Sequence, residues 1–127
     1  MKKAHLTSEA PAPIGPYSQS IQAGNTLYIS GQIAIDPASG DLITGNIEDE
    51  THQVLKNIGA ILKSAGLGYA HVVSCTVFVK DMDQFSRINN VYTQYFSEGH
   101  PPARALVQVS ALPKYVNIEI AAIAHFE

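Results

Sequence analysis

Apolar residues recur along this chain at two different spacings, and the changes of spacing delimit the expected elements. Alternation with a period of two predicts strands at residues 17–23, 26–35, 71–80, 104–109 and 116–126. Spacings of three and four predict helices at residues 47–65 and 83–98. The order β-β-α-β-α-β-β is an α+β pattern in which both helices pack on one face of a mixed sheet.

The boundaries of the two helices have recognisable signals. Asn46 is a candidate N-cap for the first helix, and three acidic residues follow at positions 48–50, in the first turn. Gly66 is expected to end this helix. Asp83 is the corresponding candidate cap of the second helix, which we expect to end before Gly99.

The strands predict how side chains divide between the faces of the sheet. In the strand at 26–35 the aliphatic face comprises Leu27, Ile29, Gly31, Ile33 and Ile35. In the strand at 71–80 one face comprises Val73, Cys75, Val77 and Val79. Two helices cover only one face, so the other is either solvated or covered by a neighbouring subunit. Because the strands are so aliphatic, we favour the neighbour.

Composition excludes several classes of protein. The length of 127 residues predicts one domain, residues 1–127. Only 8 residues are Lys or Arg, the net charge is −3, and no basic stripe is present, which argues against a nucleic-acid partner. No run approaches the roughly 18 apolar residues of a membrane span. The single cysteine, Cys75, fits a reducing compartment, so we expect a cytoplasmic protein without a membrane partner.

Arg104 is the first candidate for chemistry, because it opens an otherwise apolar strand. A guanidinium group presents a planar set of donors that can grip a carboxylate with two hydrogen bonds. The residues alone favour a structural ion pair at the sheet edge over this functional interpretation.

Glu119 is the second candidate, because it lies among aliphatic strand residues. Burial raises the pKa of a carboxyl group, which suits acid–base work near neutral pH. Two bland alternatives are equally open: a half-exposed residue on a polar strand face, or a structural partner of Arg104.

No other constellation carries comparable weight. The five histidines lack metal-ligand spacing, and Ser30 lacks the glycines that flank the nucleophile of serine hydrolases. The aromatic stripe of the second helix is more typical of a core than of a binding platform.

Five short segments, in order, resemble the Rid/YjgF family. They are Ala12-Pro13-Ile14-Gly15-Pro16-Tyr17-Ser18-Gln19, Ser30-Gly31-Gln32-Ile33, Thr76-Val77-Phe78-Val79-Lys80-Asp81, Ile88-Asn89-Asn90-Val91-Tyr92 and the run from Pro102 to Leu112 followed by Ile118-Glu119-Ile120.

This resemblance implies a chorismate-mutase-like fold and a homotrimer with active sites between subunits. It implies hydrolytic deamination of 2-imino acids such as 2-iminopropanoate and 2-iminobutanoate to 2-keto acids and ammonia, with neither cofactor nor metal. A non-catalytic ligand-binding or regulatory trimer that uses the same cleft is the alternative, and a chaperone-like interaction role is a third.

The resemblance also implies residue roles. Arg104 would bind the substrate carboxylate, and Glu119 would orient water and assist the imine nitrogen. Tyr17, Ser30 and Asn89 would line the pocket, and Gly31 would admit the substrate close to the backbone. At Leu106 many relatives carry cysteine; the leucine either preserves hydrolysis through backbone groups or reshapes the pocket.

Overall fold

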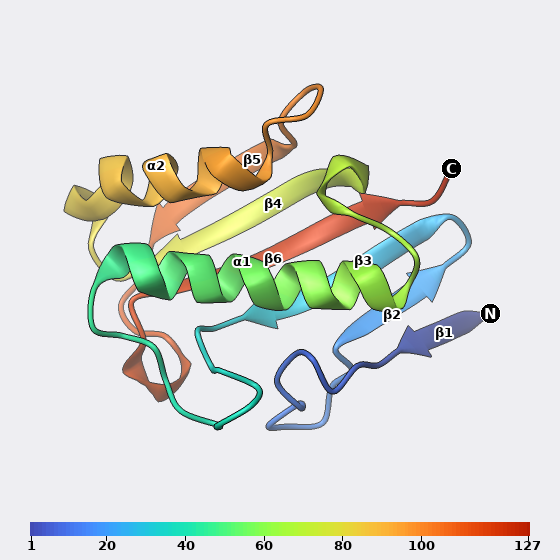
Figure 1. Ribbon diagram of the computed structural model, residues 1–127, viewed down its shortest axis with the longest axis horizontal. Helices are drawn as coiled ribbons and strands as arrows, with labels where there is room; N and C mark the ends of the chain where they lie inside the picture. Colours follow the sequence, from blue (N-terminus) through green and yellow to red (C-terminus); the bar gives the residue numbers. More distant parts are fainter.

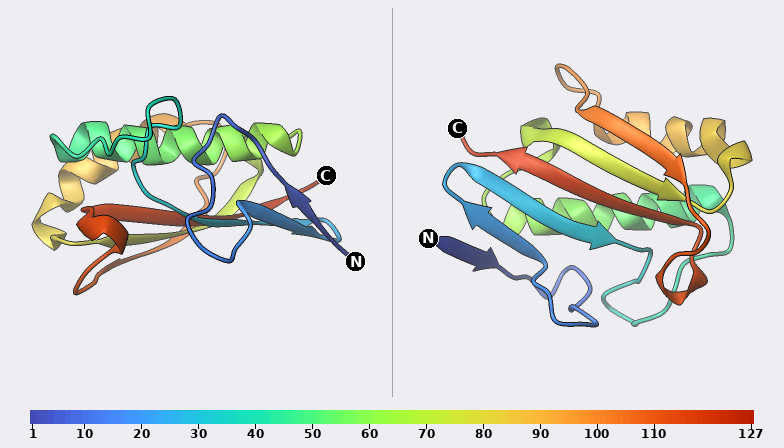
Figure 2. Two further views of the ribbon diagram at one scale, coloured as in Figure 1. Left: turned by 90° about the horizontal axis from the view of Figure 1, so that it is seen from below. Right: turned by 180° about the vertical axis from the view of Figure 1, so that it is seen from behind.

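Six strands form one mixed sheet in the computed structural model, which describes residues 1–127, and two helices lie across one face of it (Figure 1). The strands are β1 (Lys2–His5), β2 (Ser20–Ala23), β3 (Thr26–Gln32), β4 (Val72–Val79), β5 (Ala103–Gln108) and β6 (Ile118–His125). The helices are α1 (Ile47–Ser64) and α2 (Phe85–Tyr95). Figure 2 shows both helices on the same side and the other face of the sheet bare. The expected α+β architecture is therefore confirmed.

The strand order is β1-β2-β3-β6-β4-β5, so β1 and β5 are the two edges. Only β4 and β5 run parallel; all other neighbours are antiparallel. A parallel pair needs a crossover, and α2 supplies it. This crossover places α2 above the β5 edge of the sheet, while α1 packs over β6 and β3.

The signals at the ends of α1 act as expected. The Asn46 side chain accepts a hydrogen bond from the backbone N–H of Asp49 at 2.9 Å. Gly66 adopts a φ of 76°, and the backbone N–H of Leu67 returns to the carbonyl of Leu62. Such a left-handed residue satisfies the last helical carbonyls, and glycine adopts it without a steric penalty.

The expected limits of the second helix were wrong at both ends. Asp81, not Asp83, is the cap: its carboxylate accepts from the Asp83 N–H at 2.9 Å, at the start of a short 3-10 turn that leads into α2. The helix then ends at Tyr95, three residues before the expected end at residue 98. Asp81 and Asp83 carry the same local capping signal, so the sequence does not distinguish them. The backbone conformation decides which of the two acts as the cap.

The N-terminal strand β1 was not expected. It pairs antiparallel with β2, Lys2 opposite Ala23 and His5 opposite Ser20. Three of its four residues are exposed. An edge strand with mainly solvated side chains has no apolar periodicity, so the sequence pattern does not predict it.

Two irregularities overturn the expected face assignments. The pairing of β3 with β6 shifts between Ile29 and Gln32, and the pairing of β4 with β6 shifts between Val72 and Ser74. β3 ends at Gln32, before the expected end at residue 35. Val73 is exposed, although it was expected to share a face with Cys75, which is buried. A one-residue shift moves the following side chains to the other face.

The core lies between the helices and the sheet, and it contains one buried carboxylate. Glu50, in the first turn of α1, is fully buried. It accepts hydrogen bonds from the backbone N–H groups of Asn117 and Ile118, at 2.7 and 3.2 Å, and from the Asn117 side-chain amide at 2.7 Å. Glu50 thus ties the start of α1 to the start of β6.

The face of the sheet away from the helices is largely apolar. Tyr28 pairs with Ile123, and Phe78 pairs with Val107, on strands whose alternate residues are buried under the helices. Tyr28 and Val107 are among the exposed large hydrophobic residues of the chain. Neither helix combines the length and apolar character that crossing a bilayer requires.

Candidate functional site

Arg104 lies on the edge strand β5, and its side chain points to the helix side. It is paired with the buried Cys75 of β4. One guanidinium nitrogen (Nη1) donates to the Asn89 side-chain oxygen on α2 at 2.8 Å. The guanidinium carbon lies 4.8 Å from the centroid of the Tyr92 ring and 5.7 Å from that of Phe85.

Arg104 has no carboxylate partner within the chain, in contrast to Arg87. Arg87 forms two hydrogen bonds of 2.7 Å with Glu48, so it is ion-paired rather than simply solvated. The prediction that Arg104 forms a structural ion pair is therefore wrong. A guanidinium held in place, with most of its donors unused, is suited to bind an anion.

A cavity of about 320 Å³ opens elsewhere, between the proline-rich arm, β3 and the start of β6. Its lining comprises Pro11, Ala12, Ile14, Tyr17, Gln19, Ser30, Gly31, Gln32, Ile33, Ile35, Pro113 and Glu119. Four of the residues proposed from the sequence, Tyr17, Ser30, Gly31 and Glu119, thus line one cavity.

Glu119 is the only ionisable carboxylate in this cavity. Its neighbours Ile118 and Ile120 are fully buried under the helices, so Glu119 points to the opposite face. Burial raises the pKa of Glu119 above its ordinary value. A Cβ atom on Gly31 would overlap the Glu119 carboxylate, so a glycine is needed where this carboxylate lies against the backbone. This contact also shows that Gly31 shares the face of Glu119 and not that of Leu27 and Ile29, as the alternation predicted.

The arm over the cavity is held by Gln19, which sequence reasoning missed. Its amide nitrogen donates to the carbonyls of Thr7, Ala10 and Pro11, and its oxygen accepts from the Thr7 N–H. Gln19 has no periodic signal, because its partners are backbone atoms of an irregular segment.

Tyr17 and Ser30 are themselves held by backbone contacts. The Tyr17 hydroxyl accepts from the Ile14 N–H at 3.3 Å, and the Ser30 hydroxyl donates to the Ser18 carbonyl at 2.6 Å. Both side chains therefore shape the cavity wall.

Arg104 and Glu119 lie on opposite faces of the sheet, so the chain does not bring them together. Through the register, Arg104 aligns with Cys75 and then with Ala122 of β6. Glu119 lies three residues before Ala122 in β6, which separates the two backbones by two strand spacings of about 4.8 Å and three rises of about 3.3 Å. The idea that Glu119 is the structural partner of Arg104 is therefore wrong. Asn89 lies on the helix side with Arg104, and so does the Leu106 side chain, which packs against the core.

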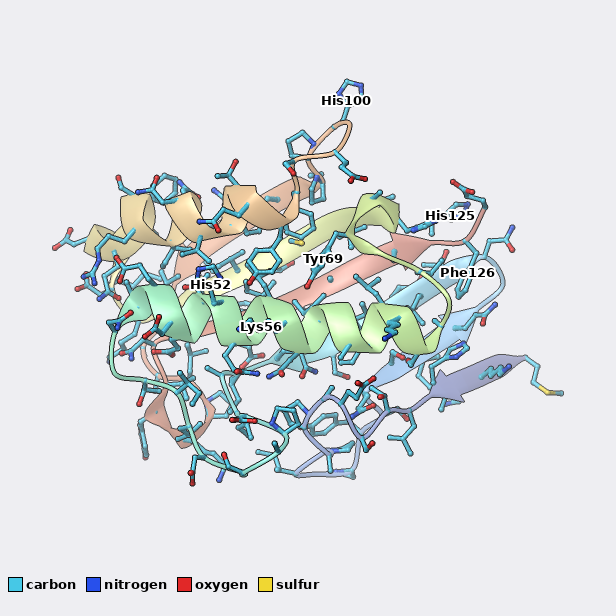
Figure 3. The ribbon with its side chains drawn as sticks, viewed as in Figure 1. His52, Lys56, Tyr69, His100, His125 and Phe126 are labelled. Carbon is cyan, nitrogen blue, oxygen red and sulfur yellow. The ribbon has the colours of Figure 1, made fainter.

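No histidine lines the cavity. Figure 3 places His100 at the tip of the loop before β5 and His125 near the end of β6. His52 is partly buried, and its Nδ1 lies 2.7 Å from the Tyr95 hydroxyl.

Comparisons with known proteins match the sequence and the fold of this chain. A family model described as endoribonuclease L-PSP matches residues 7–126. The chain is 54% identical over 127 residues to a RutC family protein of Pyrococcus horikoshii, covering 100% of both chains. It is 49% identical over 124 residues to the 2-iminobutanoate/2-iminopropanoate deaminase of Mus musculus, covering 98% of this chain and 91% of the mouse protein. The structure of E. coli TdcF with bound serine superposes with a TM-score of 0.94 at 39% identity, covering 98% of this chain and 99% of that one.

Proposed function

We propose, from the premise that this chain belongs to the YjgF/Rid family, that it hydrolyses reactive 2-imino acids such as 2-iminopropanoate and 2-iminobutanoate to 2-keto acids and ammonia. Mammalian relatives about half identical to this chain carry the corresponding deaminase name. In this proposal the reaction uses neither metal nor cofactor and takes place in the cytoplasm.

The state of Arg104 is the observation that carries the proposal. Partial burial of an arginine without an acidic partner costs free energy, and a bound anionic ligand would offset that cost. Asn89 occupies one of its five N–H donors, which leaves an edge of the guanidinium for a carboxylate. Every 2-imino acid has such a carboxylate next to its C=N carbon.

A complete site requires a second copy of the chain. Because Arg104 and Glu119 lie on opposite faces, no small substrate touches both in one chain. In the proposed homotrimer, the β5 edge of one subunit lies against the cavity of the next. The apolar face that carries Tyr28, Phe78, Val107 and Ile123 would then be buried between subunits, as large exposed apolar surfaces usually are.

In the first step, the Arg104 of one subunit grips the carboxylate and holds the C=N carbon near Glu119 of its neighbour. The Glu119 carboxylate stabilises the protonated imine and orients a water molecule. The water oxygen attacks the C=N carbon, its proton passes to Glu119, and the π electron pair moves to nitrogen.

In the second step, Glu119 returns that proton to the nitrogen of the carbinolamine. The C–N bond breaks, its electron pair leaves with ammonia, and the remaining hydroxyl loses a proton to Glu119 as the C=O bond forms. Ammonia finally takes this proton and leaves as ammonium. A carboxyl group whose pKa is raised by burial suits both transfers, because it gives up and regains the proton more evenly near neutral pH.

The endoribonuclease description of the family model is a less suitable guide to this chain. Arg87 is paired with Glu48, Arg104 is held beneath α2, and the sequence has no basic stripe. Phosphate backbones are bound by clusters of such cations.

The test is keto-acid release from 2-iminobutanoate generated in the cuvette by threonine dehydratase. We expect wild type to accelerate release over the spontaneous rate, and Arg104→Ala to lose about a hundredfold in kcat/KM because the carboxylate clamp is gone. Arg87→Ala removes an exposed, paired arginine and serves as the matched control.

No acceleration by wild type would contradict the deaminase proposal. Calorimetric binding of 2-oxobutanoate that depends on Arg104 would, in that case, indicate a ligand-binding trimer that uses the same cleft.

A further inference from the structure

We propose that Phe85 and Tyr92 are positioning residues that, together with Asn89, hold the Arg104 guanidinium in the orientation that binds a carboxylate. This inference rests on the proposed function for its catalytic consequence. It assigns a role to two aromatic residues of α2, the exposed Phe85 and the buried Tyr92.

The three residues form one stripe on α2. Phe85, Asn89 and Tyr92 are separated by four and three positions, the spacing that aligns side chains along one side of a helix. Their contacts with Arg104 differ in kind: two rings near the guanidinium group and one amide oxygen at its edge. We refer to them as the α2 cradle.

The cradle restrains the guanidinium in two complementary ways. The rings attract the cation through their negative faces, and the Tyr92 ring is the nearer of the two, at 4.8 Å. The hydrogen bond from Nη1 to Asn89 limits rotation about the last side-chain bonds. A long, flexible arginine is thereby ordered before a ligand arrives, which reduces the entropy lost on binding.

Aromatic rings suit this task because they use no N–H donor. A carboxylate in place of either ring would neutralise the guanidinium and occupy the donors that a substrate needs. The cradle therefore stabilises the charge and leaves it free to act.

The Tyr92 hydroxyl is not the part of the residue that matters for the cradle. It is buried next to the Cys75 thiol, a weak hydrogen-bond partner, and forms no other hydrogen bond. The hydroxyl faces Cys75, whereas the ring lies 4.8 Å from the Arg104 guanidinium carbon, so the ring accounts for the role of this residue better than the hydroxyl does. The inference thus separates Tyr92→Phe, which keeps the ring, from Tyr92→Leu, which removes it.

The kinetic test compares these two variants in the imine assay. A carboxylate clamp acts on substrate and transition state alike, so its misplacement raises KM more than it lowers kcat. We expect Tyr92→Leu to raise KM about tenfold, the scale of a partly desolvated cation–π contact, and Tyr92→Phe to restore it. Val91→Ala, at a buried position of the same helix outside the α2 cradle, controls for a general loosening of α2.

A second readout does not depend on activity. The chain has only two arginines, Arg87 and Arg104, so the side-chain Nε–H region of an NMR spectrum contains two signals, which Arg87→Lys assigns. We expect a ring-current shift of the Arg104 signal, preserved in Tyr92→Phe and lost in Tyr92→Leu.

These readouts separate failure of the cradle from failure of the proposed function. If wild type hydrolyses imines while Tyr92→Leu changes neither KM nor the Arg104 signal, the cradle is overturned and the deaminase stands. If no imine is hydrolysed but the ring-current shift is lost only in Tyr92→Leu, the cradle stands and the deaminase falls. A rise in KM of the same size in Val91→Ala would also overturn the cradle, because the effect would then be general loosening.

Discussion

Glu119, the residue we propose for proton transfer, lies in surroundings that lower stability when it is charged. Its carboxyl group is half-buried, has no hydrogen-bond donor from the chain, and lies against the backbone of Gly31. Because desolvation raises its pKa, the folded protein holds the proton more tightly than the unfolded chain does. The stabilising contribution of that proton is present below the unfolded pKa, about 4.3, and is lost as pH rises through the folded pKa.

We therefore expect Glu119→Gln, a neutral isostere, to have a higher Tm than wild type at pH 8, although it should impair hydrolysis. The gain should shrink at pH 4, where the wild-type group is largely protonated. Thermal unfolding at both pH values measures the difference, with Glu9→Gln as an exposed control. An equal difference at the two pH values would show that desolvation of Glu119 is unimportant.

Glu50 is the opposite case, a buried carboxylate whose acceptors are used. It joins α1 to β6 through three hydrogen bonds. We expect Glu50→Ala to lower the free energy of unfolding by about 3 kcal/mol, because the backbone N–H groups of Asn117 and Ile118 lose their acceptor. Urea denaturation measures the loss. Glu48→Ala, two residues away in an exposed pair with Arg87, should have a much smaller effect; equal losses would contradict this account of Glu50.

At the scale of elements, α1 has one position where a helix-favouring substitution should fail. The Tyr69 hydroxyl, on the segment before β4, donates to the carbonyl of Leu55 at 2.7 Å. A Cβ atom on Gly59 would overlap that hydroxyl. Glycine at this position allows the tyrosine to lie against the helix backbone.

Gly59→Ala should consequently lower the free energy of unfolding by about 1–3 kcal/mol, the usual cost of overpacking, instead of raising it as alanine does in most helices. Gly45→Ala, where nothing lies within 4 Å of the added atom, is the control. Chemical denaturation of both variants, and of Gly59→Ala combined with Tyr69→Phe, checks the mechanism: partial recovery in the double variant is expected, and no recovery would exclude the hydroxyl as the cause.

The connection from β5 to β6 contains backbone strain beside the cavity. Lys114 and Tyr115 have φ values of 54° and 56°, a region that non-glycine residues seldom occupy, and they follow the cavity residue Pro113. Tyr115 is 88% exposed, so packing within the chain does not offset this strain.

Replacing Tyr115 by Asn, which tolerates this conformation, should raise the free energy of unfolding by about 0.5–1 kcal/mol relative to Tyr115→Ala. The alanine variant removes the same side chain without relieving the backbone, so the difference in Tm between the two isolates the strain. Equal Tm values would show that the turn relaxes at no cost.

At the scale of the whole molecule, the division of the site between two faces makes a prediction that no single-chain site would share. Arg104→Ala and Glu119→Gln should each lose about a hundredfold or more in kcat/KM when assayed alone. When the two variants are unfolded, mixed and refolded together, some interfaces combine an intact Arg104 with an intact Glu119. With random assembly about a quarter of the sites are complete, so activity should return to about a quarter of the wild-type value.

Imine hydrolysis by the refolded mixture, compared with each variant refolded alone, is the measurement. A mixture as inactive as its components would contradict a shared site. Sedimentation of the mixture, expected at the mass of three chains, would show whether assembly itself had failed.

Much of this architecture follows from local signals in the sequence. Asn46 and Gly66 mark the ends of α1 because a cap needs only a side-chain acceptor or a left-handed residue at one position. The Gly24-Asn25 turn between β2 and β3 is equally local. Five segments were sufficient to identify the family, and with it the residues proposed for the site.

Only the tertiary structure decided which of these residues meet. The register shifts after Ile29 and Val72 depend on pairing with β6, far along the chain, and each shift reverses the face of the residues that follow. The strand order and the α2 crossover decided that Arg104 is held beneath α2 and is not ion-paired. They also decided that Glu119 lies on the opposite face of the sheet. The sequence by itself determined the elements, their caps and the family, because those depend on neighbouring residues. The division of the site between two faces depends on contacts between strands distant in sequence, which no local pattern encodes.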